Sequence, residues 1–312
     1  MDARSDHNQY GHTLVIAGTG SSVGKTSIAL GMTAALVRRG VAVQPYKVGP
    51  DFLDPTYLRL AAGRECYNLD GWMCGQSYVQ RLFERLAADA EINIIEGVMG
   101  LFDGADTGSL AGSTAEIASW LRAPVLLVVN AHGMGKSFAA MVKGYTEFDP
   151  SVHIAGVIAN KVGSDSHTAL LRDALEANAL PELIGAIPRG ALPKLPSRHL
   201  GLISADSTVI SDSAISTLAD ACERFININK LSSRLSDTAC PPSPSATALP
   251  QTPHVKIGVA RDKAFHFCYP DNIRAFEENG AEIRYFSPLQ DAGLPDDLDA
   301  VYLPGGYPEE HV

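Results

Sequence analysis

Short apolar runs alternate with amphipathic segments over residues 1–231. The runs are four to six residues long, rich in Val and Ile, and show no alternation of apolar and polar positions, which is typical of strands covered on both faces. We expect strands at 14–17, 41–46, 92–95, 125–129, 154–159 and 183–187. Strand–helix alternation of this kind predicts an α/β fold, a doubly wound and mostly parallel sheet with helices on both faces.

Helical periods separate these runs. Apolar residues at 79, 82, 83 and 86 lie on one helix face behind Ser77, which we expect to cap that helix. Ser113 and Glu116 have the spacing of a capping box ahead of another apolar stripe. A further stripe covers 170–175. These segments are the predicted helical layers.

The pattern changes near residue 230. Residues 232–253 hold five prolines, many Ser, Thr and Ala, and no apolar period, so we expect a linker there. A second α/β unit follows, with strands at 255–260, 282–286 and 300–303, a helix near 272–278 and Gly280 as its stop. The predicted domains are therefore 1–231 and 254–312. The second is short and lacks a closing strand, so we expect it to be the opening part of a domain.

Composition and charge narrow the possible functions. Hydrophobic residues make up 46% of the chain and charged residues 19%, as in globular proteins. The formal net charge of -10 disfavours binding to nucleic acids or anionic membranes. No apolar run is long enough to span a bilayer, and residues 1–11 lack a signal-peptide core, so we expect a cytoplasmic protein. Five scattered cysteines without a C-x-x-C pair disfavour a disulfide framework or zinc site.

The strongest motif is the glycine-rich segment 18–26, which follows the first strand and opens a helix expected to end near Gly40. Backbone N–H groups of such a loop can wrap a polyphosphate. Lys25 would reach the β- and γ-phosphates, and the Thr26 hydroxyl would bind Mg²⁺. The glycine that normally lies five residues before Gly24 stands one residue earlier here. The predicted nucleotide contacts are Thr19, Gly20, Ser21, Ser22, Val23, Gly24, Lys25 and Thr26.

Carboxylates follow two of the predicted strands. Glu96 ends the strand at 92–95 and precedes a glycine-rich loop, while Asp51 and Asp54 follow the strand at 41–46. Open α/β sheets bind ligands at the carboxyl ends of their strands, where an acid can hold Mg²⁺ directly or through water. Asp51 and Asp54 can equally be solvated loop acids, and the residue types alone do not decide.

Other polar residues follow the later strands. Asn160 ends the fifth strand, where it could recognise a base edge or cap a turn. Pro188 and Arg189 follow the sixth strand and could line the same pocket. His132 and His199 are isolated, and isolated histidines in loops are more often structural than catalytic.

Taken in chain order, these motifs resemble the cobyrinate a,c-diamide synthases, glutamine-dependent ligases of corrinoid biosynthesis. The resemblance covers nearly the whole sequence. The first unit is also similar to dethiobiotin synthetase, which shares the longer, Thr-containing phosphate loop. The segments that carry the resemblance are 18–26, 46–55, 68–70, 96–104, 112–115, 196–202, 286–289 and 303–309.

The resemblance implies a P-loop NTPase-like domain followed by the start of a class I glutamine amidotransferase-like domain. It implies phosphorylation of the c and then the a side-chain carboxylate of cobyrinate by ATP with Mg²⁺. Ammonia from glutamine would then displace phosphate from each acyl phosphate. The implied roles are Mg²⁺ binding by Thr26, Asp51 and Glu96, substrate placement and catalysis by Lys25, Asp51, Asp54 and Asp103, and adenine binding by Asn160, Pro188 and Arg189.

The chain departs from this family in a few positions. Ser22 stands where family members often have glycine, and Cys268 stands at a usually aromatic position. Gly305 and Gly306 resemble the loop that donates N–H groups to an oxyanion. The family's nucleophilic Cys and its His base would lie beyond Val312, so we expect that this polypeptide alone does not hydrolyse glutamine.

Several alternatives stay open at this stage. Nickel-sirohydrochlorin and hydrogenobyrinate a,c-diamide synthases share most of these motifs. A partition-type switch ATPase would carry a lysine five residues before Lys25, where this chain has Gly20. An inactive fragment is a third possibility. The expected partners are a tetrapyrrole carboxylate and glutamine or ammonia, with a homodimer possible.

Overall fold

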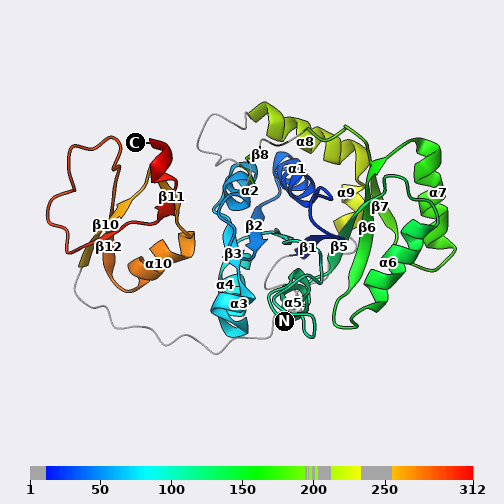
Figure 1. The fold of residues 1–312 in the computed structure, drawn as a ribbon, viewed down its shortest axis with the longest axis horizontal. Helices are drawn as coiled ribbons and strands as arrows, with labels where there is room; N and C mark the ends of the chain where they lie inside the picture. Colours follow the sequence, from blue (N-terminus) through cyan, green and yellow to red (C-terminus); the bar gives the residue numbers. More distant parts are fainter. Residues whose placement is uncertain are drawn as a thin grey trace, which may run out of the picture. The chain divides into compact units, whose positions relative to one another are not determined.

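The computed structural model describes residues 12–193, 195, 197–198, 201–202, 212–232 and 255–311. The chain divides into two compact units between Ser243 and Pro244 (Figure 1), inside the stretch predicted as a linker. The expectations for residues 1–11, for His199 and for linker residues 233–253 lie outside the described residues. Among the described residues, no helix has the length and apolar character needed to cross a membrane.

The first unit is built on a seven-stranded sheet in the order β3-β2-β4-β1-β5-β6-β7. Every neighbouring pair is parallel, which confirms the predicted parallel α/β sheet. Its strands are β1 (His12–Gly18), β2 (Val43–Val48), β3 (Tyr67–Leu69), β4 (Ile92–Glu96), β5 (Val125–Asn130), β6 (Ile154–Val162) and β7 (Leu183–Pro188).

Five strands of the first unit contain the predicted ranges and extend beyond them by one to three residues, whereas β2 is shifted and β3 was not predicted. The second strand was expected at 41–46, but β2 runs from Val43 to Val48 because buried ion pairs allow Lys47 to stay within the strand. The edge strand β3 was missed. It has only three residues, and two of them are partly exposed, so it carries no apolar run for the sequence to show.

Helices cover both faces of the sheet, and the buried side chains form two clusters. Residues of α1, α2 and α8 pack on one face, and residues of α4, α5, α6 and α7 pack on the other (Figure 1). The helices are α1 (Lys25–Arg38), α2 (Asp54–Ala62), α3 (Gly71–Cys74), α4 (Gln76–Ala87), α5 (Thr114–Trp120), α6 (Ser137–Glu147), α7 (Asp165–Glu176), α8 (Asp212–Phe225) and α9 (Ile228–Ser232).

Of the two predicted helix caps, one is confirmed and one is wrong. The Ser113 side chain accepts a hydrogen bond from the Glu116 N–H at the start of α5. Ser77 does not cap α4, because that helix begins one residue earlier, at Gln76. Its N-cap is Gly75, whose φ of 75° suits glycine.

The second unit contains the predicted strands and helix. Its three-stranded parallel sheet has the order β12-β10-β13, formed by β10 (Val255–Ala260), β12 (Ala281–Phe286) and β13 (Ala300–Tyr302). Helix α10 spans Pro270–Glu278. A short antiparallel pair, β11 (Phe265–Phe267) with β14 (Gly305–Gly306), was not expected, and a 3₁₀ turn covers Pro308–His311. A further two-residue pair in the first unit joins β8 (Ser197–Arg198) to β9 (Gly201–Leu202).

The position of β4 fixes where a ligand can bind. β4 lies between β2 and β1 in the sheet. The chain therefore places β2, β3 and β4 on one side of β1, and then crosses over to place β5, β6 and β7 on the other side. Ligands of open α/β sheets bind at such a switch point, beyond the carboxyl ends of the strands. Ile16 of β1 is paired with Glu96 of β4, so the glycine-rich loop and Glu96 leave the sheet side by side.

Candidate functional site

The glycine-rich loop closes tightly over the start of α1. Gly24 is the N-cap of that helix, with a φ of 107°. A Cβ at Gly24 would lie 2.4 Å from Asn160 Nδ2, and one at Gly18 would lie 2.5 Å from Val23 Cγ2. No side chain caps α1, and no acid lies in its first turn. Its first N–H groups, with the positive end of the helix dipole, therefore favour an anion.

Other segments hold the backbone of this loop in place. The Tyr145 hydroxyl donates to Thr19 O at 2.8 Å, and Leu101 N donates to Gly18 O at 2.8 Å. Asn160 Nδ2 donates to Val23 O at 2.8 Å. Because these bonds come from α6, from the loop after β4 and from β6, the loop is braced on several sides before any ligand binds.

Lys25 lies at the opening of the loop. Its ammonium donates to Gly20 O at 2.8 Å and to Met99 O at 2.5 Å. Burial, followed by the charge of Lys47, lowers the pKa of Lys25, while nearby carboxylates oppose this shift. The Thr26 hydroxyl, next along the helix, donates to Glu96 Oε1 at 2.5 Å. The structure thus brings the predicted Lys25, Thr26 and Glu96 together.

A buried ion cluster adjoins this group and contains a residue that the sequence prediction did not include. Lys47 Nζ lies 2.5 Å from Asp54 Oδ2 and 3.2 Å from Glu96 Oε1, and it donates to Gly97 O at 3.2 Å. The side chains of Lys47 and Glu96 are 3% and 0% exposed. Charges this deeply buried require compensation. The signal that could have identified Lys47 is a lone lysine within an apolar strand, directly before the segment 48–55.

The charged groups of this cluster shift one another's pKa values. Burial raises the pKa of Glu96 to about 7, and the nearby Asp54 raises it as well, while Lys47 acts in the opposite direction. Burial alone would lower the pKa of Lys47, but Glu96 and Asp54 raise it above its usual value. Lys47 therefore stays protonated at neutral pH, and Glu96 can take up a proton near neutral pH.

Asp51 and Asp103 border the same cluster. Asp51 Oδ1 accepts hydrogen bonds from Leu53 N at 2.7 Å and Asp54 N at 3.3 Å, so this acid orders the start of α2. Burial and then Asp54 raise the pKa of Asp51. Asp103 Oδ2 accepts from Gly100 N at 2.8 Å, and the charge of Asp103 acts on Lys25. Both acids therefore belong to the site region rather than to distant surface loops.

The loop that carries Asp51 is anchored to the neighbouring strand. Asn68 Nδ2 donates to Gly49 O at 2.8 Å and to Asp51 O at 2.7 Å. On the other side of Glu96, the Thr114 hydroxyl bonds both the N–H and the carbonyl of Val98. Sequence reasoning assigned no role to Asn68 or Thr114, because their contribution depends on contacts between segments far apart in the chain.

The residues predicted to meet the adenine lie on the other half of the sheet edge. Asn160 is 4% exposed. Its amide donates to Val23 O and accepts from Lys161 N, so in this structure it supports the phosphate loop. Arg189 N donates to Val162 O at 3.1 Å, and the Arg189 guanidinium contacts His132. Pro188 ends β7 beside them. Asn160 therefore bonds the phosphate loop while Arg189 contacts His132, and the role of these residues at the base stays a prediction.

The donor set at Glu96 fits Mg²⁺. Among the residues that the structure describes, Glu96 Oε2 is buried without a hydrogen-bond partner, while Oε1 faces the Thr26 hydroxyl. Mg²⁺ is commonly held by one or two carboxylates together with phosphate oxygens and water. The described part of the chain has no cluster of three or more His, Cys, Asp or Glu side chains suited to a metal, so phosphate oxygens would have to supply further ligands.

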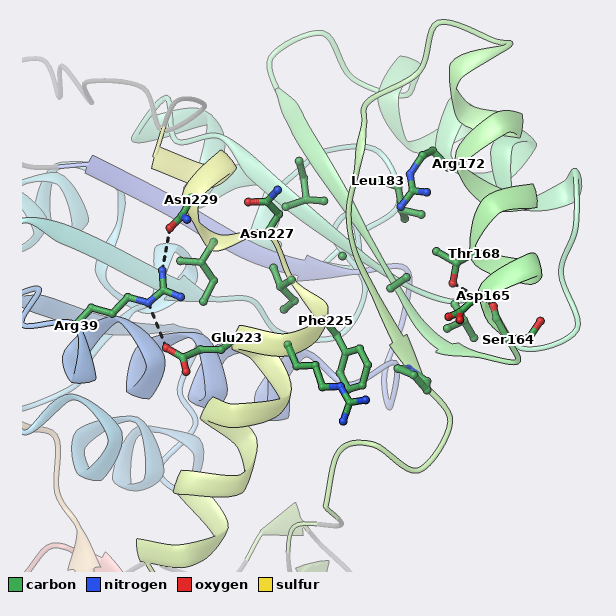
Figure 2. A pocket seen from close by; sticks show the side chains of 18 residues that line it. Arg39, Ser164, Asp165, Thr168, Arg172, Leu183, Glu223, Phe225, Asn227 and Asn229 are labelled. Carbon is green, nitrogen blue, oxygen red and sulfur yellow. Dashed lines mark hydrogen bonds and ion pairs between the residues drawn. The ribbon is translucent and has the colours of Figure 1, made fainter.

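A cavity of about 510 Å³ lies away from this cluster, between β7, α7 and the end of α8 (Figure 2). Of the predicted site residues, only Pro188 lines it. Figure 2 shows Arg39 at one end, where it pairs with Glu223 at 3.2 Å and bonds Asn229 at 3.0 Å. Arg172 and Arg224 also line the cavity, which contains none of the residues predicted to be catalytic.

Two known families match parts of this chain. Residues 14–203 match the family described as CobQ/CobB/MinD/ParA nucleotide binding domain, and residues 256–312 match the CobB/CobQ-like glutamine amidotransferase domain. The cobyrinate a,c-diamide synthase of Syntrophotalea carbinolica is 58% identical over 96% of this chain and 65% of its own length. The hydrogenobyrinate a,c-diamide synthase of Brucella anthropi is 42% identical over 96% of this chain and 68% of its own.

Among solved structures, the Pyrococcus furiosus cell division ATPase MinD aligns over 68% of this chain and 99% of its own, with 17% identity and a TM-score of 0.37. The chain spans about 65% of the length of the first curated relatives.

Proposed function

Because the chain belongs to the cobyrinate a,c-diamide synthase family, we propose that it takes part in ATP-dependent amidation of the a and c side-chain carboxylates of a corrinoid. The observation that carries the proposal is the contact between the phosphate loop and the buried cluster. Thr26 of the loop bonds Glu96, and Glu96 pairs with Lys47. A nucleotide held by the loop would therefore meet an acceptor held at the cluster.

The proposed reaction has two steps. An oxygen of the substrate carboxylate forms a bond to the γ-phosphorus of ATP, and the bond between that phosphorus and the β–γ bridging oxygen breaks, releasing ADP. Ammonia then forms a C–N bond with the acyl carbon, phosphate leaves with the C–O bonding pair, and the nitrogen loses a proton. Each carboxylate consumes one ATP and one ammonia.

Each group of the site supports one part of this reaction. Lys25 and the N-terminus of α1 would neutralise the charge that develops between the β- and γ-phosphates. Thr26, Glu96 and Asp51 would hold Mg²⁺, which when bound screens the phosphate charge from the attacking carboxylate. Asp54 and Asp103 would place the acceptor and influence breakdown of the intermediate. Lys47 keeps Asp54 and Glu96 together and offsets their charge.

The second unit supports glutamine as the nitrogen donor, because it matches a glutamine amidotransferase domain. Free ammonia can serve the first unit in its place. A partition-type switch ATPase is less well supported, since Gly20 occupies the position of the extra lysine of that class. The cytoplasmic location, the homodimer and the lack of glutamine hydrolysis by this polypeptide stay predictions.

The test uses the purified protein with ATP, Mg²⁺ and ammonium, so that its outcome does not depend on glutamine hydrolysis. Cobyrinate, hydrogenobyrinate and nickel-sirohydrochlorin are supplied in separate reactions, and mass spectrometry follows conversion of two acids into two amides. We expect diamide formation from one macrocycle, with ADP released in proportion. ATP binding without amide formation from any macrocycle would overturn the proposal.

A further inference from the structure

Two large apolar side chains are exposed to solvent beside the candidate site. Trp72 and Met73, on the four-residue helix α3, are 69% and 59% exposed. Indole and thioether side chains are costly to leave in water when a folded chain could bury them. Such side chains at a surface commonly mark a binding surface.

The exposure of these two residues is fixed by their surroundings. Asp70 caps α3 by accepting from Met73 N at 2.9 Å, and Gly75 N donates to Gly71 O at 3.1 Å. A Cβ at Gly71 would lie 2.5 Å from Glu116 Oε2 and 2.9 Å from the Trp120 ring. The turn is therefore packed against α5 at Gly71, while the next two residues, Trp72 and Met73, are exposed.

The turn lies between loops that carry catalytic candidates. Leu69 O, just before it, accepts from Gly49 N at 3.0 Å, and Asn68 holds the carbonyl of Asp51. On the other side, a Cβ at Gly112 would lie 3.9 Å from the Trp72 Cβ and 3.5 Å from the Ala105 Cβ. The segment that leads into Trp72 is thus bonded to the Asp51 loop, and Trp72 itself lies beside the loop that follows Asp103.

The depth of the site determines which part of a substrate can reach this turn. Glu96 and Lys47 are buried, so a large ring must stay outside, and only a group as small as a side-chain carboxylate could approach them. We propose that Trp72 and Met73 form a platform for the apolar face of the tetrapyrrole ring while its carboxylate enters the site. This inference rests on the proposed function and adds the residues that select a macrocyclic acceptor.

The small exposed apolar area of Trp72 and Met73 argues for a ring system as the ligand rather than a protein partner. The residues that follow the turn, Gln76 and Ser77, are exposed and polar, as are residues 106–109 of the loop that follows Asp103. Specific protein interfaces bury on the order of 800 Å² per partner, far more than one indole and one thioether can supply. A flat ring stacked on an indole buries only the two ring faces that contact each other, and this area is enough for binding.

The test measures binding of cobyrinate to the full protein without ATP, by equilibrium dialysis. We expect Trp72→Ala to raise the Kd for cobyrinate about tenfold or more, and Met73→Ala to raise it less. Trp72→Phe, which keeps an aromatic face, should stay within about threefold of the parent. Leu170→Ala removes another exposed apolar side chain, 51% exposed on α7, and should leave the Kd unchanged. In turnover with ammonium, Trp72→Ala should raise KM for the macrocycle more than it lowers kcat.

The outcomes separate this inference from the proposed function. Parental cobyrinate affinity in Trp72→Ala would overturn the platform, whether or not the oligomeric state changed. A matching loss of ATP affinity in Trp72→Ala would also overturn it, because the indole would then be structural. Trp72-dependent binding without amide formation would support the platform and count against the proposed reaction.

Discussion

Replacing Lys47 with methionine tests the buried cluster most directly. Methionine keeps much of the apolar stem but removes the ammonium that pairs with Asp54 and Glu96 and bonds Gly97 O. Removing one partner of a buried pair costs about 3–5 kcal/mol, because the remaining charge loses its compensation. Asp54 is 13% exposed and keeps some hydration. We therefore expect Lys47→Met to lower the free energy of unfolding by about 3 kcal/mol at pH 8.

The loss should shrink as the pH falls. Burial raises the pKa of Glu96 to about 7 in the presence of Lys47, and loss of the ammonium raises it further. Between pH 6 and 8 the folded variant therefore holds more protons than the folded parent, so its stability falls faster than that of the parent as the pH rises. One extra proton is worth at most about 1.4 kcal/mol per pH unit. The destabilisation at pH 6 should be smaller by about 1–2 kcal/mol.

Urea unfolding followed by tryptophan fluorescence provides the assay. The chain has two tryptophans, Trp72 and Trp120, and both lie in the first unit, so the signal reports that unit. Lys143→Met is the matched control, because Lys143 forms an exposed pair with Glu147 and should change stability by less than about 0.5 kcal/mol. Adding Asp54→Asn to Lys47→Met should restore part of the loss. A cost below about 1 kcal/mol at pH 8, or one independent of pH, would refute the reasoning.

Three further predictions concern single residues. Lys25→Ala should lower kcat for amide formation about 10²-fold or more, because a charge-stabilising group is lost; turnover equal to that of Lys143→Ala would contradict its role. Ser22 has a φ of 60°, so Ser22→Gly should stabilise the first unit by about 0.5 kcal/mol after the entropic cost of glycine, and a lower urea midpoint would argue against it. Burial raises the pKa of Cys66 well above its usual value and that of Cys222 to about 12, while Cys74 is exposed. Mass mapping after alkylation at pH 8 should therefore find Cys74 modified before Cys66 and Cys222, and early labelling of Cys66 would contradict the structure.

The sequence predicts those strands of the sheet that contain a buried apolar run, because such a strand can be identified from its own residues. Buried runs of Val and Ile locate β1, β4, β5, β6 and β7, because strands covered on both faces need no polar alternation. β3 has only three residues, two of them partly exposed, and only its pairing with β2 reveals it as a strand.

The site was predictable where a motif is contiguous, and less so where a role depends on contacts. The phosphate loop, Thr26 and Glu96 follow from the chain order of strand, loop and helix. Lys47 was missed because its importance comes from Asp54 and Glu96, which lie 7 and 49 residues away in the numbering. Asn160 was expected at the base, and its bond to Val23 O could not be foreseen from its position alone.

The insertion of β4 between β2 and β1 has a consequence for folding during synthesis. β2 and β3 are neighbours and can pair as soon as residue 69 has emerged, whereas β1 hydrogen-bonds only β4 and β5. The first strand therefore has no neighbouring strand to pair with until residues 92–96 have been synthesised. Closing so long an intervening loop costs entropy and slows folding. We expect the phosphate loop to acquire its shape late, when β4 joins two previously separate parts of the nascent chain.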